Sequence, residues 1–355
     1  MRPIDSETLV YGMAVPDDPQ ISPNGDRIVY SLTTGDREKQ QMTTELWVCD
    51  IDGQRHDQLT RTTAADPKAS GGSSRGARWS PDGGAIAFVS NRVKKSGVFI
   101  LPMNGAGEPR EITRHNHGIS DLAWSPEGQQ LAYTTTYDPE NPDESEPEEG
   151  SAPPVRVTRR IDYKQDGRGY LNDTRLHIWV VDVTSGERRR LTQTPLDHAF
   201  PQWSPDGTRI AAQVSSMNGM HSQLTVIDVA SGDATTIGPE DGVIGAWSWS
   251  PSGDRIIYAG DTDRTWQLDW FVHDIGSGET RRLTDDLPSL PVSGSPGDSA
   301  PSQPVWLDDR QVLFHAIRAG GSGLSIIDSE QGTVEPMVQW QAQHGGFSVG
   351  ADHRY

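Results

Sequence analysis

The sequence has one cysteine, few lysines and no long apolar run. Cys49 has no second cysteine to pair with, which excludes an intramolecular disulfide and fits a reducing compartment. No segment approaches the roughly 18 apolar residues that a membrane-spanning helix needs. Residues 1–13 contain no basic segment followed by an apolar core, so no signal peptide is predicted. We therefore expect a soluble, cytoplasmic protein.

Positive charge is also scarce, because 31 Lys and Arg face 50 Asp and Glu, giving a net charge of −19. Nucleic acids and anionic membranes bind basic surfaces, so neither is an expected partner. Only five of the 31 basic residues are lysine. An acidic surface with few lysines predicts a protein from a high-salt organism, and an ordinary acidic protein from a GC-rich genome is the alternative.

Turn-forming residues are abundant, with 37 Gly and 25 Pro among 355 residues. A unit that reads Trp-Ser-Pro-Asp-Gly, followed by a short β run, recurs along the chain. In such a turn Pro fixes φ, Asp accepts hydrogen bonds from the nearby backbone, and Gly takes a positive φ. Five clear copies and a degenerate sixth begin at Ile21, Trp79, Trp124, Trp203, Trp249 and Trp306.

A second unit follows most copies of the first. It is an apolar strand that ends in Asp, then a turn with Gly, and often a strand that ends in Leu-Thr, as at Leu59-Thr60, Leu191-Thr192 and Leu283-Thr284. Two hairpins per unit make a four-stranded sheet, and such sheets arranged radially form a β-propeller. The predicted fold is all-β, with six recognisable repeats of four-stranded blades. The Trp before Ser-Pro is expected to pack between neighbouring sheets.

The longest interval between copies carries an insertion, predicted at about residues 137–176 of a single propeller domain over residues 1–355. Residues 138–150 are acidic and rich in proline, which predicts a mobile surface loop. Residues 155–171 are basic and aromatic, which predicts an ordered hairpin or arm. Residues 347–355 resemble the start of a truncated seventh repeat, and a six-bladed ring with a short tail is the alternative.

Residues 159–171, which contain Asp-Gly-Arg-Gly-Tyr, lead into the strand at 177–182. Together with the Ser-Pro-Asp-Gly blades, this arm resembles the N-terminal propeller of acylaminoacyl-peptidase and dipeptidyl-aminopeptidase enzymes of the prolyl oligopeptidase family. The resemblance covers essentially the whole chain, although TolB-like propellers share the single blades. It implies a propeller that caps a hydrolase domain with a Ser, Asp, His triad and screens peptide substrates.

The family pattern is not complete in these 355 residues, because they contain no segment for a hydrolase domain. No triad residue can be assigned, so the predicted function is the substrate-gating part of a serine peptidase, catalytically incomplete on this chain and without a cofactor. A stand-alone TolB-like propeller that binds a protein partner is the alternative from another class. A propeller enzyme with a central metal or sugar site would need acidic or histidine residues converging from several blades, and no such register is evident.

Three local patterns were weighed as sites. Ser74 lies in a Gly-x-Ser-x-Gly pattern, but no strand is predicted before it and no helix after it, so an inter-blade loop is favoured over a nucleophile elbow. His115 and His117 form a pair without a third metal ligand, which also favours a loop. Cys49 lies in an apolar strand and is expected to be an inert core residue.

The arm is the candidate interdomain or subunit contact, through Arg159, Arg160, Tyr163, Lys164, Arg168 and Tyr170.

Overall fold

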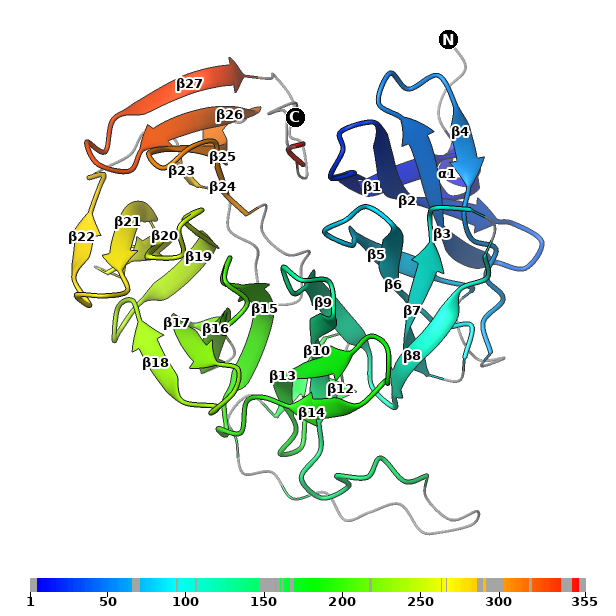
Figure 1. Cartoon of the computed structure of the whole chain (residues 1–355). Helices are drawn as coiled ribbons and strands as arrows, with labels where there is room; N and C mark the ends of the chain where they lie inside the picture. Colours follow the sequence, from blue (N-terminus) through cyan, green and yellow to red (C-terminus); the bar gives the residue numbers. More distant parts are fainter. Residues whose placement is uncertain are drawn as a thin grey trace.

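The computed structural model is a ring of antiparallel β-sheets around a central axis (Figure 1). It describes residues 5–65, 71–93, 95–105, 107–146, 157, 160, 163–166, 169–216, 219–262, 264–265, 267–285, 290–291, 303–318, 321–339 and 347–350. Within these residues the strands form six blades and one two-stranded hairpin. The predicted β-propeller of four-stranded blades is confirmed.

The blades follow one another in chain order, and we number the sheets accordingly. A short helix, α1 (Ser6–Tyr11), comes first. The first sheet holds β1 (Ala14–Ile21), β2 (Arg27–Asp36), β3 (Gln41–Asp50) and β4 (His56–Gln58). The second holds β5 (Ser74–Trp79), β6 (Ala85–Ser90), β7 (Ser96–Pro102) and β8 (Arg110–His115). The third holds β9 (Ile119–Trp124), β10 (Gln130–Tyr137), β13 (Arg175–Asp182) and β14 (Arg188–Arg190).

The remaining sheets continue around the ring. The fourth holds β15 (Asp197–Trp203), β16 (Arg209–Ser216), β17 (His221–Asp228) and β18 (Ala234–Ile237). The fifth holds β19 (Val243–Trp249), β20 (Arg255–Asp261), β21 (Asp269–Asp274) and β22 (Thr280–Arg282). The sixth holds β23 (Leu290–Pro291), β24 (Val305–Trp306), β25 (Gln311–Arg318), β26 (Gly321–Asp328) and β27 (Val334–Gln339). This last sheet departs from the four-strand pattern because β23 and β24 both pair with β25.

The repeated turn joins the first and second strands of each of the first five blades. In the second blade, Ser80 Oγ accepts a hydrogen bond from Ala85 N at 2.9 Å, and Gly83 N donates to Ser80 O at 2.8 Å. Gly83 has a φ of 69°, a conformation that favours glycine. The serine is buried, so this bonding satisfies polar groups that water cannot reach. The same serine bond recurs at Ser22, Ser125, Ser204 and Ser250.

The recurring Leu-Thr also has a structural cause. Thr60 Oγ1 accepts a hydrogen bond from Leu46 N at 2.9 Å and donates to the buried Glu45 carboxylate at 2.5 Å. Thr284 repeats this arrangement with Trp270 N and the Asp269 carboxylate. The threonine hydroxyl thereby bonds the end of the outermost strand to the third strand of the same blade.

We call the contact between two neighbouring sheets a joint. At four joints the motif tryptophan donates its indole N–H to a carbonyl on the innermost strand of the preceding blade, as Trp79 does to Gln20 O at 3.0 Å. The other three bonds join Trp124 to Arg78 O, Trp203 to Ala123 O, and Trp249 to Gln202 O. The prediction that these tryptophans pack between sheets is confirmed.

Five clusters of buried hydrophobic residues fill the joints between consecutive sheets, from the first and second to the fifth and sixth. In the described residues, no cluster contains members of both the sixth and first sheets. Residues 347–350 lie between these two sheets, drawn in red in Figure 1. They form no strand, and residues 351–355 are outside the described part, so the start of a seventh repeat stays a prediction.

No helix among the described residues is long and apolar enough to cross a membrane.

Candidate functional site

The predicted arm contains a small hairpin, β11 (Lys164–Gln165) paired with β12 (Gly169–Tyr170). The rings of Tyr163 and Tyr170 lie 6.3 Å apart, and Lys164 Nζ is 5.4 Å from the centre of the Tyr170 ring. Both tyrosines are 47% exposed. Three of the six candidate contact residues therefore share one exposed hairpin.

The other three candidates are placed differently. Arg160 has a side chain only 8% exposed, donates to Thr174 O at 2.9 Å, and pairs with Asp197 at 3.6 Å. Because Asp197 begins β15, Arg160 attaches the insertion to the fourth sheet and does not belong to the exposed surface. Arg159 and Arg168 lie outside the described residues.

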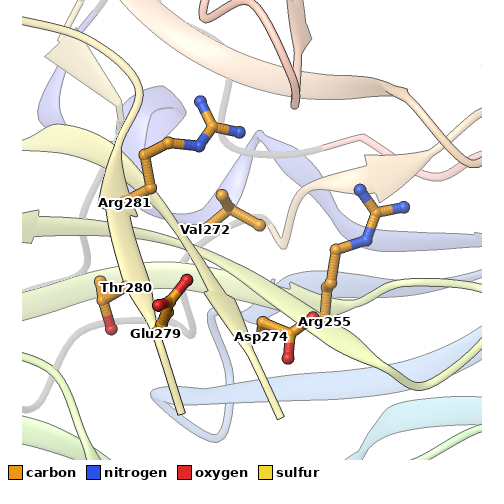
Figure 2. A pocket seen from close by; sticks show the side chains of 6 residues that line it. All are labelled: Arg255, Val272, Asp274, Glu279, Thr280 and Arg281. Carbon is orange, nitrogen blue, oxygen red and sulfur yellow. The ribbon is translucent and has the colours of Figure 1, made fainter. Parts of the chain in front are cut away.

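Two shallow grooves were considered as ligand sites. The first, of about 460 Å³, is lined by Arg255, Val272, Asp274, Glu279, Thr280 and Arg281. Figure 2 shows the two arginine side chains extending in the same direction. Arg255 donates to Asp309 O at 2.8 Å, and Arg281 donates to Ser329 O and Glu330 O at 2.9 Å. These guanidinium groups connect the fifth and sixth sheets, so the groove is part of a joint.

The second groove, of about 490 Å³, is lined by Pro16, Asp17, Pro19, Tyr30, Leu32 and His56. Tyr30 and Leu32 alternate along β2 with Val29, which packs toward the second sheet. Since successive side chains of a strand point to opposite faces, this groove lies on the face of the first sheet that is turned away from the second sheet. Two of its three titratable side chains bond each other, because Tyr30 Oη lies 2.9 Å from His56 Nδ1.

Ser74 is neither in a loop nor a nucleophile. The expected inter-blade loop is wrong at this position, because Ser74 begins β5 and is 0% exposed. Its Oγ lies 2.6 Å from Thr62 Oγ1 and 3.1 Å from Ser90 Oγ, and Arg92 donates to it at 3.4 Å. None of these groups is a general base, and a substrate cannot reach the hydroxyl. Pairing with β6 overrides the glycine-rich sequence around Ser74.

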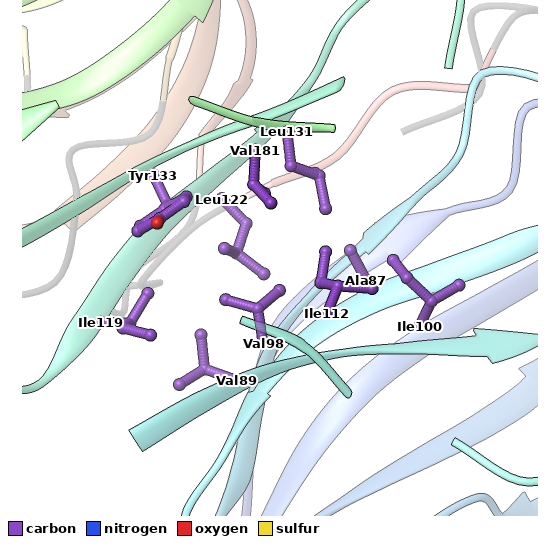
Figure 3. Packing of buried hydrophobic residues seen from close by; sticks show 10 residues of the cluster. All are labelled: Ala87, Val89, Val98, Ile100, Ile112, Ile119, Leu122, Leu131, Tyr133 and Val181. Carbon is purple, nitrogen blue, oxygen red and sulfur yellow. The ribbon is translucent and has the colours of Figure 1, made fainter. Parts of the chain in front are cut away.

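The expected loop is also wrong for His115, because this residue ends β8 and is buried. Its Nδ1 lies 2.5 Å from Glu144 Oε1, and its Nε2 lies 2.9 Å from Tyr133 Oη. The order carboxylate, imidazole, hydroxyl resembles a catalytic chain. However, Tyr133 packs within the cluster shown in Figure 3, and burial raises its pKa to about 12. The hydroxyl stays protonated and inaccessible, so this chain of bonds is structural.

No metal or thiol chemistry emerges from the described residues. No group of three or more His, Cys, Asp or Glu side chains in this part of the chain could hold a metal ion. Cys49 is buried in β3, and burial raises the pKa of its thiol, which makes it a poor nucleophile.

A backbone feature at one repeated position of the innermost strands was not predicted from the sequence. The fourth residue before the motif serine has a positive φ of 53–65° at Asp18, Gly76, Asp121 and Phe200. The signal was its constant offset from each serine. Arg78 donates to Asp18 at 2.7 Å, while Asp121 accepts from Ser120 Oγ and Phe200 N. Burial raises the pKa of Asp121. The bond between Arg78 and Asp18 joins β5 to β1, and the bond between Phe200 and Asp121 joins β15 to β9.

Comparisons with known proteins agree with the propeller. The WD domain, G-beta repeat family matches residues 108–139, which span β8 to β10. The chain is 33% identical over 193 residues to the uncharacterized peptidase YuxL of Bacillus subtilis, which covers 54% of this chain and 28% of that protein. It is 26% identical over 184 residues to dipeptidyl-peptidase 5 of Porphyromonas gingivalis, covering 50% and 23%.

The acylaminoacyl peptidase of Pyrococcus horikoshii shares the fold, with a TM-score of 0.71 at 15% identity over 98% of this chain and 49% of that one. The chain thus corresponds to half or less of each of these three proteins. It is therefore a six-bladed β-propeller that resembles the propeller of acylaminoacyl peptidase and is related in sequence to proteins named as peptidases.

Proposed function

We propose that the chain is the propeller part of a serine peptidase of the prolyl oligopeptidase family, where it controls which peptides reach a separately folded hydrolase domain. The observation that carries this proposal is the match of 98% of the chain to one half of an acylaminoacyl peptidase. The sequence relationship to two proteins named as peptidases supports it.

The described side chains support a role without chemistry of its own. The two hydroxyls nearest to a catalytic pattern, Ser74 and Tyr133, are fully buried. On the innermost strands, Asp18 bonds Arg78, and Asp121 accepts hydrogen bonds from Ser120 Oγ and Phe200 N. The chain therefore supplies shape and contacts, and the hydrolase domain supplies the nucleophile. We propose peptides as the substrates and, given the charge of −19, neither nucleic acid nor membrane as a partner.

We further propose that the hairpin is a contact surface for the hydrolase domain or for a neighbouring subunit. Tyr163, Tyr170 and Lys164 support this role, because aromatic groups with a nearby cation are exposed together. Large aromatic side chains are enriched in protein interfaces. Arg159 and Arg168 remain predicted members of the same surface.

The first test is hydrolysis of acyl-aminoacyl and aminoacyl chromogenic peptides by the purified chain at high salt, with a serine-directed inhibitor as control. We expect neither turnover nor covalent labelling by the inhibitor. Inhibitor-sensitive turnover with the label on this chain would contradict the proposal, and Ser74→Ala would then test the residue responsible.

A second test asks whether the chain associates with a hydrolase. The tagged chain is purified from the cells that produce it, and the eluate is treated with a fluorescent serine-directed probe. We expect a labelled hydrolase and acyl-aminoacyl peptide hydrolysis that co-elute with the tagged chain. If the eluate contains neither, the chain acts as a propeller scaffold outside peptide hydrolysis.

We also propose that the protein works in a high-salt cytoplasm, because it combines a charge of −19 with five lysines. Simple screening of surface charge is nearly complete by about 1 M salt, where the Debye length is about 3 Å. We expect the thermal unfolding midpoint to keep rising between about 1 and 3 M KCl. A midpoint that stops rising below about 1 M would identify an ordinary acidic protein.

A further inference from the structure

Residues 138–146, which we call the strap, follow β10 of the third sheet but are attached to the second sheet. Glu144 makes the attachment with three groups. Its Oε1 lies 2.5 Å from His115 Nδ1, its Oε2 accepts a hydrogen bond from Asn116 N at 2.5 Å, and its backbone carbonyl accepts one from Asn116 Nδ2. The strap therefore crosses a joint and is held mainly by Glu144. Glu146 adds an ion pair of 3.7 Å with Lys95.

The strap has a defined local structure that presents Glu144. Ser145 N donates to Asn141 Oδ1 at 3.0 Å, and Asn141 Nδ2 donates to Ser145 O at 2.9 Å. Glu144 N donates to Asn141 O at 3.1 Å, and Glu144 itself has a φ of 51°. Residues 138–146 are a mostly exposed loop, as predicted, and their mobility stays a prediction. Proline and acidic residues indicated exposure correctly, but they carried no information about a bond to a distant histidine.

The neighbours of His115 fix its protonation state. Its Nε2 lies 2.9 Å from Tyr133 Oη and 3.2 Å from Arg188 Nη1. Because arginine can only donate, Nε2 must be an unprotonated acceptor, and the proton of the neutral ring is on Nδ1. Nδ1–H then donates to the Glu144 carboxylate. Adding a proton to Nε2 would place two donors and two positive charges face to face.

We propose that Glu144 and His115 form a proton-operated latch that holds the strap against the second sheet and releases it under acid conditions. The strap leads into the insertion that carries the β11–β12 hairpin. Opening the latch would therefore free the first part of that insertion while leaving the six sheets intact.

The direction of the pH dependence follows from the groups that face the latch. Burial and then Arg188 lower the pKa of His115 from its ordinary 6.5, against the opposing effect of Glu144. His117 also lowers it. Burial opposes ionisation of Glu144, but the hydrogen bonds from His115 and Asn116 outweigh it and lower the pKa of that carboxyl.

Glu144 thus has a lower pKa in the closed latch, where His115 and Asn116 donate to its carboxylate, than in the open one. A group with a depressed pKa contributes stability above its ordinary pKa and loses it as the pH falls through the depressed value. The latch is therefore at full strength above the ordinary pKa of Glu144, about 4.5, and weakens progressively below it.

Hydrogen exchange measured by mass spectrometry on the full chain tests the proposal, after correction for the intrinsic pH dependence of exchange. The amides of Asn116, Glu144 and Ser145 report on the latch because each is a hydrogen-bond donor there. At neutral pH we expect Glu144→Gln to exchange at least about tenfold faster at these amides than the wild type, since a bond to a charged group is lost. Asp143→Asn, which removes one carboxylate charge from the exposed neighbouring residue, is the matched control and should exchange like the wild type.

The wild type should approach the Glu144→Gln rate as the pH falls below about 4.5, while the variant's own rate stays constant with pH. Tryptophan fluorescence checks that the sheets remain folded over that range. The proposal is overturned if Glu144→Gln exchanges like the wild type at neutral pH. It is equally overturned if wild-type protection is unchanged down to the pH at which the sheets unfold.

Discussion

The five filled joints and the seam between the sixth and first sheets are built differently. At each joint, buried hydrophobic residues from two neighbouring sheets form one cluster, as Val29 and Leu46 do with Ile86 and Phe88. At the seam the described contacts run through residues 347–350. Ile21 N donates to Ser348 Oγ at 2.9 Å, and the Phe347 ring lies 6.5 Å from His315. Among the described residues, hydrophobic clusters thus join the sheets at five places, and only these two contacts are described at the seam.

The difference is already present in the repeat. Copies two to six have tryptophan before the motif position, whereas the first copy has Ile21. In copies two to five the indole N–H reaches back to the preceding blade. An arginine of that blade often stacks on the ring, as Arg27 does on Trp79 at 5.0 Å. The first blade has no indole to reach back to the sixth. A β-propeller can therefore specify each joint with one aromatic residue.

The largest effect should come from emptying a filled joint. Leu46→Ala removes a fully buried side chain from the cluster between the first and second sheets, which should cost about 2–5 kcal/mol of unfolding free energy. Leu32→Ala is the matched control, because Leu32 lies on the opposite face of the same sheet, in the second groove. Urea unfolding of both variants measures the difference. Equal losses of unfolding free energy would show that the face of the first sheet turned away from the second sheet contributes as much stability as the filled joint.

An intermediate effect should follow from removing one indole bond. Trp124→Phe keeps an aromatic ring but leaves Arg78 O without its partner, which should cost about 1–3 kcal/mol. Trp306 is the control, because its Nε1 has no hydrogen-bond partner among the described residues. Trp306→Phe should therefore lose less stability in the same urea titration. If the two variants lose the same amount, ring packing and not the hydrogen bond stabilises the joints.

The smallest effect should come from the seam itself. Ser348→Ala removes the acceptor of Ile21 N, which should cost no more than about 0.5–1.5 kcal/mol. Because no hydrophobic cluster of the described residues spans the seam, the change should appear as faster hydrogen exchange at Ile21, with the urea midpoint nearly unchanged. An unaltered exchange rate at Ile21 would mean that other groups hold the seam closed.

Much of the fold could be predicted because its causes are local. In Ser80-Pro81-Asp82-Gly83, turn geometry, the buried serine and the positive φ of glycine all act within a few residues. The alternating apolar runs on either side of the turn predicted the strands, and the number of repeats predicted a ring of blades. Even the role of the motif tryptophan followed, because a large apolar residue beside a turn has only a neighbouring blade to pack against.

The candidate site was predicted less well, since its contacts join residues far apart in the chain. The exposed hairpin around Tyr163 and Tyr170 was anticipated from its aromatic and basic composition. The inward position of Arg160 depends on Asp197, 37 residues further along the sequence. The burial of Ser74 depends on pairing with β6, which glycine-rich composition conceals.

The sequence by itself determined the blade, its two kinds of turn and the number of filled joints, because short-range bonding and side-chain alternation decide those features. Only the tertiary structure decided which polar and charged groups meet, as Glu144 meets His115 and Arg78 meets Asp18. Closing the ring brings blades into contact at positions that the repeat pattern of the sequence does not indicate. Buried polar groups must then find partners wherever the fold places them, since an unpaired buried charge is costly.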